Sequence, residues 1–366
     1  MSDAAPPVER ARAAMRSSHV DAVVAASPGL VAFLTGHVLP AHLAYPSRDG
    51  RLEKPTIAVV TLEHAVTIGV APDPEHGERV EYGHDRVGLA DGPTRFRAVA
   101  DAAASLGVRG HVAVELAWVP AAAVAALVER VSAADIRPLD DLLRPARAEK
   151  GADELTGIAE ACALADAAHA AIRASVSPGV TELELYASAV GAMNARAGDL
   201  VVSGAEIQAG PRGALMMGPP TGAAVAAGDL VMSDVYPRHP NGWWADSCST
   251  VCCGTPSPAQ RRDWHAIRNA LAAAQELLRP GVRAGEVYEE IRRCAGDQPG
   301  HAGHGIGRDH YEEPAILPDS DERLVEGAAI VVEPGCYGDG RGLRLEWAFE
   351  VTRDGGRPLT TFDLEL

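Results

Sequence analysis

The first 145 residues alternate between helical and extended patterns of hydrophobic positions. Alanine-rich stretches with apolar residues at helical spacing predict helices near residues 8–18, 94–107 and 119–133. Short apolar runs predict strands at residues 21–26, 30–34, 56–60, 65–70 and 111–115. This alternation is typical of an α/β domain. His37, His42, His64 and His76 are scattered along it, and surface or loop positions account for them.

A polar segment, Arg-Pro-Ala-Arg-Ala-Glu-Lys-Gly-Ala-Asp at residues 144–153, separates this region from the rest of the chain. A long helix is predicted directly after it. We therefore place a boundary between a domain at residues 1–146 and a second domain at residues 147–366. A chain of 366 residues is long enough for two hydrophobic cores.

The second region contains an internal repeat. Predicted helices at 153–176 and 258–278 each end in a Pro-Gly-Val sequence, at residues 178–180 and 280–282. A further helix follows each of these turns, and the first of the two opens with Thr181 and Glu184 in capping-box spacing. The sequence therefore predicts two copies of one structural unit.

The strands of this region repeat as well. A glycine-led apolar strand ends in Asp234 in the first copy and in Glu333 in the second. A second strand in each copy carries another acid, which is Asp246 or Glu346. Two hairpins related by a pseudo-twofold axis would aim these four carboxylates at one centre, beside His304 in its Gly-His-Gly-Ile-Gly segment.

Four converging carboxylates in an apolar sheet need counter-charge. Burial of even one unpaired charge costs several kcal/mol, and two divalent cations would neutralise the set. Oxygen ligands with one imidazole suit Mn²⁺, Fe²⁺, Co²⁺ or Zn²⁺ better than a structural thiolate site does. Ordinary solvated acids at strand ends are the alternative, but that alternative does not account for acids in repeat register.

The motifs that carry this chemistry resemble those of the pita-bread metal-enzyme family, which includes aminopeptidase P, prolidase, creatinase and methionine aminopeptidase. They are Arg147-x-x-Lys150, Gly228-Asp229, Trp244-Ala245-Asp246-Ser247, Gly303-His304-Gly305-Ile306-Gly307, Glu333-Pro334-Gly335 and Gly342-Leu343-Arg344-Leu345-Glu346. Leu34-Thr35-Gly36 is similar to a segment of the smaller domain in the creatinase and aminopeptidase P branch. The resemblance implies an α/β (α+β) fold with a small creatinase-like N-terminal domain and a pita-bread metal-binding domain.

The resemblance also implies roles for individual residues. Asp234 would hold one metal ion, and His304 and Glu333 the other. Asp246 and Glu346 would bridge the two ions. Glu333 would also pass a proton during catalysis, and Arg344 would fix the orientation of a ligating carboxylate. Relatives with this two-domain layout are commonly homodimers.

The chain departs from the peptidases of this family at two further histidines. Met217 stands where one of them is expected, in the loop before the first metal strand. Tyr311 stands where the other is expected, seven residues after His304. A tyrosine donates a hydrogen bond but carries protons poorly at neutral pH. His310 is the neighbouring candidate, although in a regular extended segment its side chain would point away from the site.

Aromatic residues lie close to the predicted ligands in the sequence. Tyr236, Trp243 and Trp244, with Met217, are candidates for substrate binding. Packing of the three aromatic side chains beneath the sheet is an equally good interpretation.

Composition limits the partners. The net charge of −17 argues against nucleic acid, which needs a basic face. No apolar run approaches the roughly 18 residues that span a bilayer, so no membrane association is expected. The first residues lack the pattern of a signal peptide, and the cysteines lack the spacing of a disulfide framework, which together predict a cytoplasmic protein.

Three interpretations of function remain. The first is a non-peptidase relative of creatinase that acts on a small amino-acid-derived metabolite through a metal-bound hydroxide or direct metal activation. We take this as the main expectation, because the metal ligands are intact while the outer histidines are changed. The second is an Xaa-Pro-type dipeptidase or aminopeptidase that hydrolyses a peptide C–N bond. The third is an inactive binding homologue.

Overall fold

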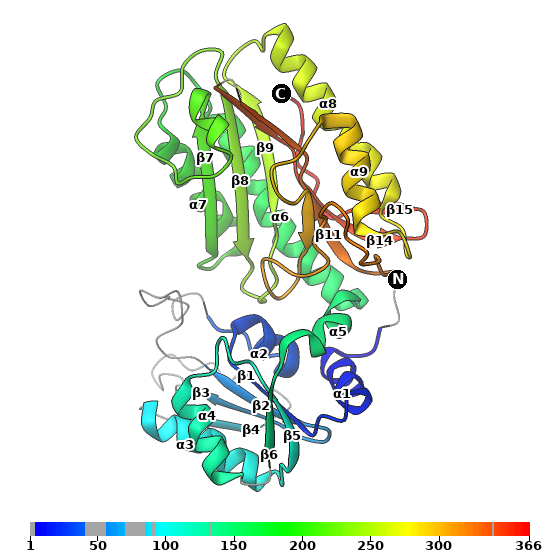
Figure 1. The fold of residues 1–366 in the computed structure, drawn as a ribbon. Helices are drawn as coiled ribbons and strands as arrows, with labels where there is room; N and C mark the ends of the chain where they lie inside the picture. The colour runs from blue at the N-terminus through cyan, green and yellow to red at the C-terminus, as the bar shows by residue number, and fades with distance from the viewer. Residues whose placement is uncertain (1–3, 41–55, 70–84, 89–91, 132–133, 339) are drawn as a thin grey trace. The chain divides into compact units, whose positions relative to one another are not determined.

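The computed structural model describes residues 4–40, 56–69, 85–88, 92–131, 134–338 and 340–366. His42 and His76 lie outside the described residues. Two compact units are present, one formed by Ala5–Arg147 and the other by Ala148–Leu366 together with Ala4 (Figure 1).

The unit Ala5–Arg147 is built on one mixed sheet. In the part of the chain described, its strands are β1 Ala22–Ala25, β2 Ile57–Thr61, β3 Ala65–Gly69, β4 Asp85–Gly88, β5 Gly110–Val114 and β6 Ala134–Pro138, in the order β4-β3-β2-β1-β5-β6. β1 pairs antiparallel with β2 and parallel with β5. Its helical segments are α1 Pro7–Ser17, α2 Pro28–Thr35, α3 Gly92–Ser105, α4 Ala121–Arg130, the 3₁₀ turn η2 Asp140–Leu143 and α5 Arg144–Ala148.

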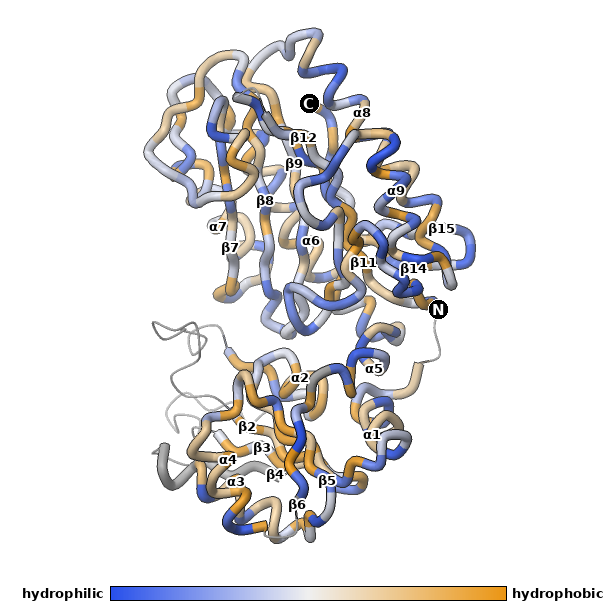
Figure 2. The backbone as a smooth tube through the Cα atoms, in the orientation of Figure 1, coloured by the Kyte–Doolittle hydropathy of each residue, from blue (hydrophilic) through white to orange (hydrophobic). Residues whose placement is uncertain are grey.

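The central strands of this sheet are apolar on both faces. Val23 and Ala25 belong to a core cluster with residues of α1 and α2, and Ala22 and Val24 belong to another with residues of α3 and α4. Figure 2 shows the same hydrophobic character along β1 and β2. A strand covered on both faces reads as a continuous apolar run, as the sequence pattern of β1 predicted.

One predicted strand of this unit is wrong. Residues 30–34 lie in helix α2, because Ser27 caps the helix by accepting a hydrogen bond from the Leu30 amide at 3.3 Å. Pro28 occupies the first turn, and Gly36 ends the helix in the left-handed region at a φ of 73°. A five-residue apolar run is compatible with either structure, and its flanking caps decide between them. The polar segment at 144–153 is also partly helical, because it contains α5.

The unit Ala148–Leu366 contains the predicted repeat. The first half is α6 Ala152–Ser175, α7 Glu182–Ala197, β7 Val202–Ala209, the 3₁₀ turn η3 Gly210–Leu215, β8 Leu230–Arg238 and β9 Ser247–Cys252. The second half is α8 Pro258–Leu277, α9 Ala284–Ala295, β10 Gly303–Gly305, β11 Ala329–Val332, β12 Gly335–Gly338, β13 Arg341–Arg344, β14 Trp347–Thr352 and β15 Gly355–Pro358. Each half is thus a helix pair followed by antiparallel strands (Figure 1).

The two Pro-Gly-Val turns have the same local structure. Gly179 and Gly281 adopt φ values of 94° and 86°, which favour glycine. After the first turn, the Thr181 hydroxyl accepts from the Glu184 amide, and the Glu184 carboxylate accepts from the Thr181 amide at 2.8 Å. The capping box that the sequence predicts therefore starts α7.

Each half has a core cluster, the first of which also contains Ala329, Val331 and Ala348 of the second half, and a strand contact joins the two halves. α6 and α7 cover β7 and β8 in one cluster, and α8 and α9 cover β11 and β14 in the other. Cys248 of β9 forms an isolated antiparallel bridge with Glu346, just before β14. This bridge brings the second acid of each half to the line where the two sheets meet.

Helix α6 is long and apolar enough to span a membrane by length and composition alone. It is a core helix instead, since Ile158, Cys162 and Ile172 are fully buried in the cluster that it forms with α7 and the β7-β8-β9 sheet. Its apolar character is therefore accounted for by packing within this unit.

Candidate metal centre

The five predicted metal ligands come from five strands or strand ends. Asp234 lies inside β8, His304 lies at the centre of β10, and Glu333 directly follows β11. Asp246 and Glu346 directly precede β9 and β14.

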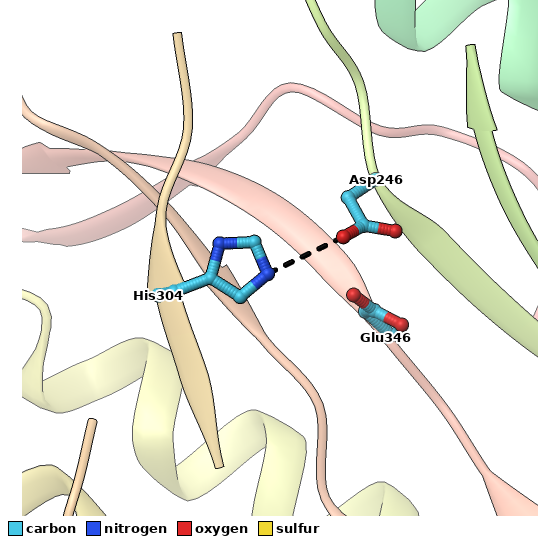
Figure 3. A group of neighbouring side chains, drawn as sticks. All are labelled: Asp246, His304 and Glu346. Atoms are coloured by element: carbon cyan, nitrogen blue, oxygen red, sulfur yellow. Dashed lines mark ion pairs between the residues drawn. The ribbon is translucent and has the colours of Figure 1, made fainter. Parts of the chain in front are cut away.

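Three of these ligands form a tight buried cluster. One ligand atom each from Asp246, His304 and Glu346 lies within 4.8 Å of the others. His304 Nε2 is 3.3 Å from Asp246 Oδ2. Figure 3 shows the imidazole ring directed at the Asp246 carboxylate, with the Glu346 carboxylate beside it. The two acids come from different halves of the repeat, as the sequence pattern predicts.

Arg344 connects the other two acids to this cluster. Its guanidinium is hydrogen-bonded to Asp234. Its Nη1 lies 3.7 Å from Glu333 Oε2, and its Nε lies 3.7 Å from Glu346 Oε2. Three of the four carboxylates therefore contact the buried guanidinium of Arg344, and the fourth, that of Asp246, lies beside Glu346 in the cluster.

The unsatisfied oxygens of the site fit divalent cations. Asp234 Oδ1, Asp246 Oδ1 and Glu346 Oε2 are buried and make no hydrogen bond to described residues. A buried polar atom without a partner costs free energy, and a bound cation removes that cost. Carboxylate oxygens with one imidazole are a donor set that divalent Mn, Fe, Co and Zn accept.

Burial and charge divide the carboxyl groups into two kinds. Burial raises the pKa of Asp234 to about 8, against the opposing effect of Arg344. Burial and the neighbouring acids also raise the pKa of Glu346 well above its ordinary value. Burial acts in the same direction on Asp246, but His310 and His304 outweigh it and hold the pKa of Asp246 below its ordinary value. Without metal, protons thus take the place of part of the missing positive charge.

His310 and Tyr311 both face the cluster. His310 Nε2 lies 2.7 Å from Asp246 Oδ2, and the Tyr311 ring stacks on His304 with ring centroids 4.2 Å apart. The argument from strand alternation against His310 is wrong, because residues 307–311 form bends instead of an extended strand. Burial lowers the pKa of His310, but the charge of Asp246 outweighs it, so the net shift is upward.

Two of the aromatic residues predicted to bind substrate contact the His310 ring. The Tyr236 ring stacks on the His310 ring at 4.8 Å, and the Trp244 ring lies 5.5 Å from it in a tilted arrangement. These rings therefore position a histidine next to the predicted metal ligands. Contact with a substrate remains a prediction for both.

Packing accounts for Trp243. Its side chain is 6% exposed and belongs to the core cluster of α6 and α7. A Cβ on Gly157 of α6 would lie 2.2 Å from its ring, and the Arg308 guanidinium covers the ring at 3.8 Å from the centroid. Of the two interpretations that the sequence leaves open, the structure supports packing for this tryptophan.

Met217 lies in the loop that follows η3, and its side chain is 57% exposed. The next residue anchors this loop to β7. The Gly218 amide donates to Glu206 at 3.0 Å, and the Gly218 carbonyl accepts from Gln208 at 3.0 Å. Glu206 lies directly opposite Asp234 in the β7–β8 pairing, so the loop is fixed to the strand that pairs with a predicted metal ligand.

His301 belongs to the site and is missing from the sequence-based prediction. Its Nδ1 lies 2.8 Å from Glu333 Oε1, and its ring contacts both His304 and Tyr311 edge to face. The Glu333 carboxylate raises the pKa of His301, against the effect of burial. The sequence signal that could have identified His301 is the His-x-x-His spacing of residues 301–304. The chain bends just before β10, and this bend places the first histidine beside the second.

Comparison with known proteins identifies the family. A model of metallopeptidase family M24 matches residues 156–353, more than half of the chain. The chain belongs to metallopeptidase family M24. A model of the creatinase/prolidase N-terminal domain matches residues 7–148. Membership confirms the predicted fold, the metal-dependent hydrolase class and the divalent-metal cofactor.

Similar proteins are dipeptidases by name. The chain is 32% identical over 222 residues to the probable dipeptidase PepE of Mycobacterium tuberculosis, which is 59% of this chain and 59% of that protein. The match therefore spans well under two thirds of that relative's length. The chain is also 29% identical over 245 residues to the Xaa-Pro dipeptidase of Pyrococcus furiosus, and this match covers 65% of this chain and 70% of that protein.

Solved structures match over nearly the full length. Dipeptidase PepE from Mycobacterium ulcerans superposes with a TM-score of 0.78 and 28% identity, covering 98% of this chain and 96% of that one. The Xaa-Pro dipeptidase from Bacillus anthracis has a TM-score of 0.82 at 24% identity, with 98% of both chains covered, which shows a shared fold.

These comparisons contradict the main functional prediction from the sequence. The sequence-based prediction was a non-peptidase that acts on a small metabolite. The relatives named above are dipeptidases or Xaa-Pro dipeptidases, so the comparisons favour the peptidase alternative. The changes at Met217 and Tyr311 do not by themselves indicate a departure from peptide chemistry. The structure offers a physical reason: two other histidines contact the predicted ligands. His310 contacts Asp246 and His301 contacts Glu333.

Proposed function

We propose that this protein is a two-metal dipeptidase that hydrolyses the peptide C–N bond of Xaa-Pro-type dipeptides with water as the second substrate. The observation that carries the proposal is the buried Asp246–His304–Glu346 cluster with half-exposed His310 and Tyr311 against it. The names of the relatives support the peptide substrate.

Asp234, Asp246, His304, Glu333 and Glu346 would hold the metal ions. When bound, two divalent ions supply Lewis-acid polarisation of a carbonyl and lower the pKa of water. Arg344 would orient Asp234 and Glu333 around them. These assignments follow the repeat and the unsatisfied oxygens of the site.

Proton transfer is the task of the protein's own side chains. Glu333 would accept and return a proton, and His301 Nδ1 lies 2.8 Å from its Oε1. His310 would donate or accept a proton at Nε2, the atom that lies 2.7 Å from Asp246 Oδ2. The Tyr311 hydroxyl would donate a hydrogen bond to a substrate oxygen, because burial raises the pKa of Tyr311 to about 12 and keeps it protonated.

The remaining features of the protein follow from the same proposal. We propose domains at residues 1–146 and 147–366, a homodimer in solution, and a cytoplasmic location. A short peptide is the proposed partner.

The test is an assay of the purified chain loaded with Mn²⁺ or Co²⁺. Met-Pro, Met-Ala and Met-Pro-Gly are compared by chromatographic separation of the products. A dipeptidase of Xaa-Pro type cleaves Met-Pro most rapidly, whereas an aminopeptidase also cleaves the tripeptide. The Glu346→Gln variant is the control for contaminating activity. Protein that carries two metal ions per chain and cleaves none of the three would overturn the proposal.

A further inference from the structure

Lys150 is a buried charged residue outside the metal centre. It lies between α5 and α6, and its side chain is 2% exposed. Its ammonium group donates to Glu312 Oε2 at 3.1 Å, and the Glu312 side chain is 6% exposed. The two residues are 162 positions apart in the chain, so the pair forms only in the folded protein.

Glu312 holds the inside of the loop that carries His310 and Tyr311. Its Oε1 accepts a hydrogen bond from the Asp309 amide at 3.2 Å, and its own amide donates to the Gly305 carbonyl at 2.8 Å. A Cβ at Gly307 would lie 2.6 Å from Glu312 Oε1, so the carboxylate rests directly on the start of the loop. Glu312 therefore holds the segment 307–312 at two points, through its carboxylate at Asp309 and through its backbone amide at Gly305.

A buried ion pair is a poor way to gain stability. Removing two charges from water costs about as much as their attraction returns, and apolar residues in the same place are often at least as stable. A buried ion pair instead contributes structural specificity, because its two charged groups can pair in one geometry only. Here that geometry sets the position of two neighbouring residues that contact metal ligands, because Tyr311 stacks on His304 and His310 bonds to Asp246.

We propose that Lys150 is a positioning residue, which clamps Glu312 and thereby holds His310 and Tyr311 in register with the metal ligands. The effect on turnover rests on the proposed function, whereas the effect on the loop does not. A displacement of about 1 Å in a catalytic group costs about 100-fold in rate. Loss of the clamp is therefore expected to lower kcat by about that factor, with KM nearly unchanged.

The experiment compares metal-loaded wild type with Lys150→Met and with Lys150→Met/Glu312→Gln. The double variant removes the unpaired buried carboxylate but keeps an amide oxygen that accepts from the Asp309 amide. Arg357→Met is the matched control, because Arg357 pairs with the buried Glu350 on β14 and β15. The readouts are metal content, kcat and KM on Met-Pro, and the rate of His310 modification by diethyl pyrocarbonate, mapped by mass spectrometry.

In the expected result, His310 of both Lys150 variants is modified faster, towards the rate of the exposed His64 in the same chain. Their metal content stays at the wild-type level. The Arg357→Met variant loses stability but keeps the wild-type modification rate. A double variant with wild-type kcat and wild-type modification of His310 would overturn the proposal, since the pair would then serve only to neutralise buried charge.

If the proposed function is wrong, the experiment gives a result that differs from failure of the Lys150 proposal. If the wild type cleaves none of the dipeptides, the turnover measurement is lost but the modification rates still test the clamp. Equal His310 modification in the wild type and in Lys150→Met overturns the clamp whatever the substrate is.

Discussion

His310 Nε2 lies 2.7 Å from Asp246 Oδ2, so a histidine one position before the expected one contacts a carboxylate of the candidate metal centre. The stacked ring of Tyr236 and the tilted ring of Trp244 limit the directions that this imidazole can take. Tyr311, at the expected position, stacks on the His304 ring. The two neighbouring side chains therefore share the space that borders the metal ligands.

Substitution of these two residues separates proton transfer from hydrogen bonding. Replacing a general acid or base costs at least about 100-fold in rate, so His310→Ala is expected to lower kcat/KM on Met-Pro by that much. Tyr311→Phe is expected to cost less, because water replaces the hydroxyl of a residue that is 45% exposed. Steady-state kinetics with matched metal loading measure both. A fully active His310→Ala variant would exclude a catalytic role for this histidine.

Asp246 and Glu346 are expected to be required for metal binding. The variants Asp246→Asn and Glu346→Gln keep the shape of each side chain but remove a negative charge from the buried cluster. We expect metal content to fall below two ions per chain and activity to fall with it. Elemental analysis after dialysis measures the metal content, and Glu326→Gln, on the surface, is the control. Unchanged occupancy in both cluster variants would show that the ions bind elsewhere.

Metal binding is expected to release protons in a pH-dependent way. Burial raises the pKa of Asp234 to about 8, so the metal-free chain holds a proton there below that pH. A cation must displace this proton, so the contribution of Asp234 to the apparent affinity rises with pH up to about 8 and then levels. Titration calorimetry with Mn²⁺ in buffers of different ionisation enthalpy measures the number of protons released. The same proton release at about pH 6.5 and about pH 9 would contradict this pKa.

Gly204→Ala is expected to disturb the site from a distance. A Cβ at this position would lie 1.8 Å from the Tyr236 ring, which must then move away from His310. We expect lower kcat together with lower stability. The control is Gly191→Ala in α7, where the added methyl group meets nothing within 4 Å. That change is expected to be neutral or to stabilise by up to about 1 kcal/mol. Equal activity of the two variants would show that Tyr236 does not position His310.

His169 is expected to make stability fall in acid. It lies on α6, is 3% exposed, and bonds to the Ser247 and Ser249 hydroxyls at 3.0 and 2.9 Å. Burial lowers the pKa of His169 from 6.5 to about 3, so the native imidazole stays neutral while the unfolded chain binds a proton. Proton binding therefore stabilises the unfolded state relative to the native state as pH falls from 6.5 towards 3. The free energy of unfolding decreases by at most about 1.4 kcal/mol per pH unit.

Denaturant unfolding of the wild type and of His169→Gln at several pH values measures this contribution. Near neutral pH the variant is expected to be less stable by about 1–3 kcal/mol, because two buried hydroxyls lose their partner. The difference shrinks as pH falls, since the variant has no imidazole to protonate. If the stability difference between the wild type and His169→Gln stays constant with pH, His169 is not the group whose protonation destabilises the native state.

The predicted metal ligands could be identified from the sequence because they depend on a repeat. Glu333 directly follows its apolar strand, as predicted, whereas Asp234 lies inside the equivalent strand, which continues to Arg238. Asp246 and Glu346 directly precede equivalent second strands. Strand pairing is regular, so equal spacing along the chain predicts equal placement in space. The helices and the capping box at Thr181 follow from equally local rules.

Residues in irregular segments were not accessible in this way. The bends at 307–311 turn His310 and Tyr311 towards the same site, although alternation along a strand would separate them. The position of His301 depends on the turn before β10, and the packing of Trp243 depends on the absence of a side chain at Gly157. Helix α2 depends on its caps, because its apolar run also fits a strand.

The sequence by itself determined the two-unit organisation, the repeat and the acids that it aims at one centre, because these follow from periodicity and spacing. Only the tertiary structure decided which groups surround those acids. The contacts of His301, His310 and the Lys150–Glu312 pair form between segments far apart in the chain or through bends without a fixed period. Long-range packing sets these positions, and no local pattern of hydrophobic and polar residues encodes it.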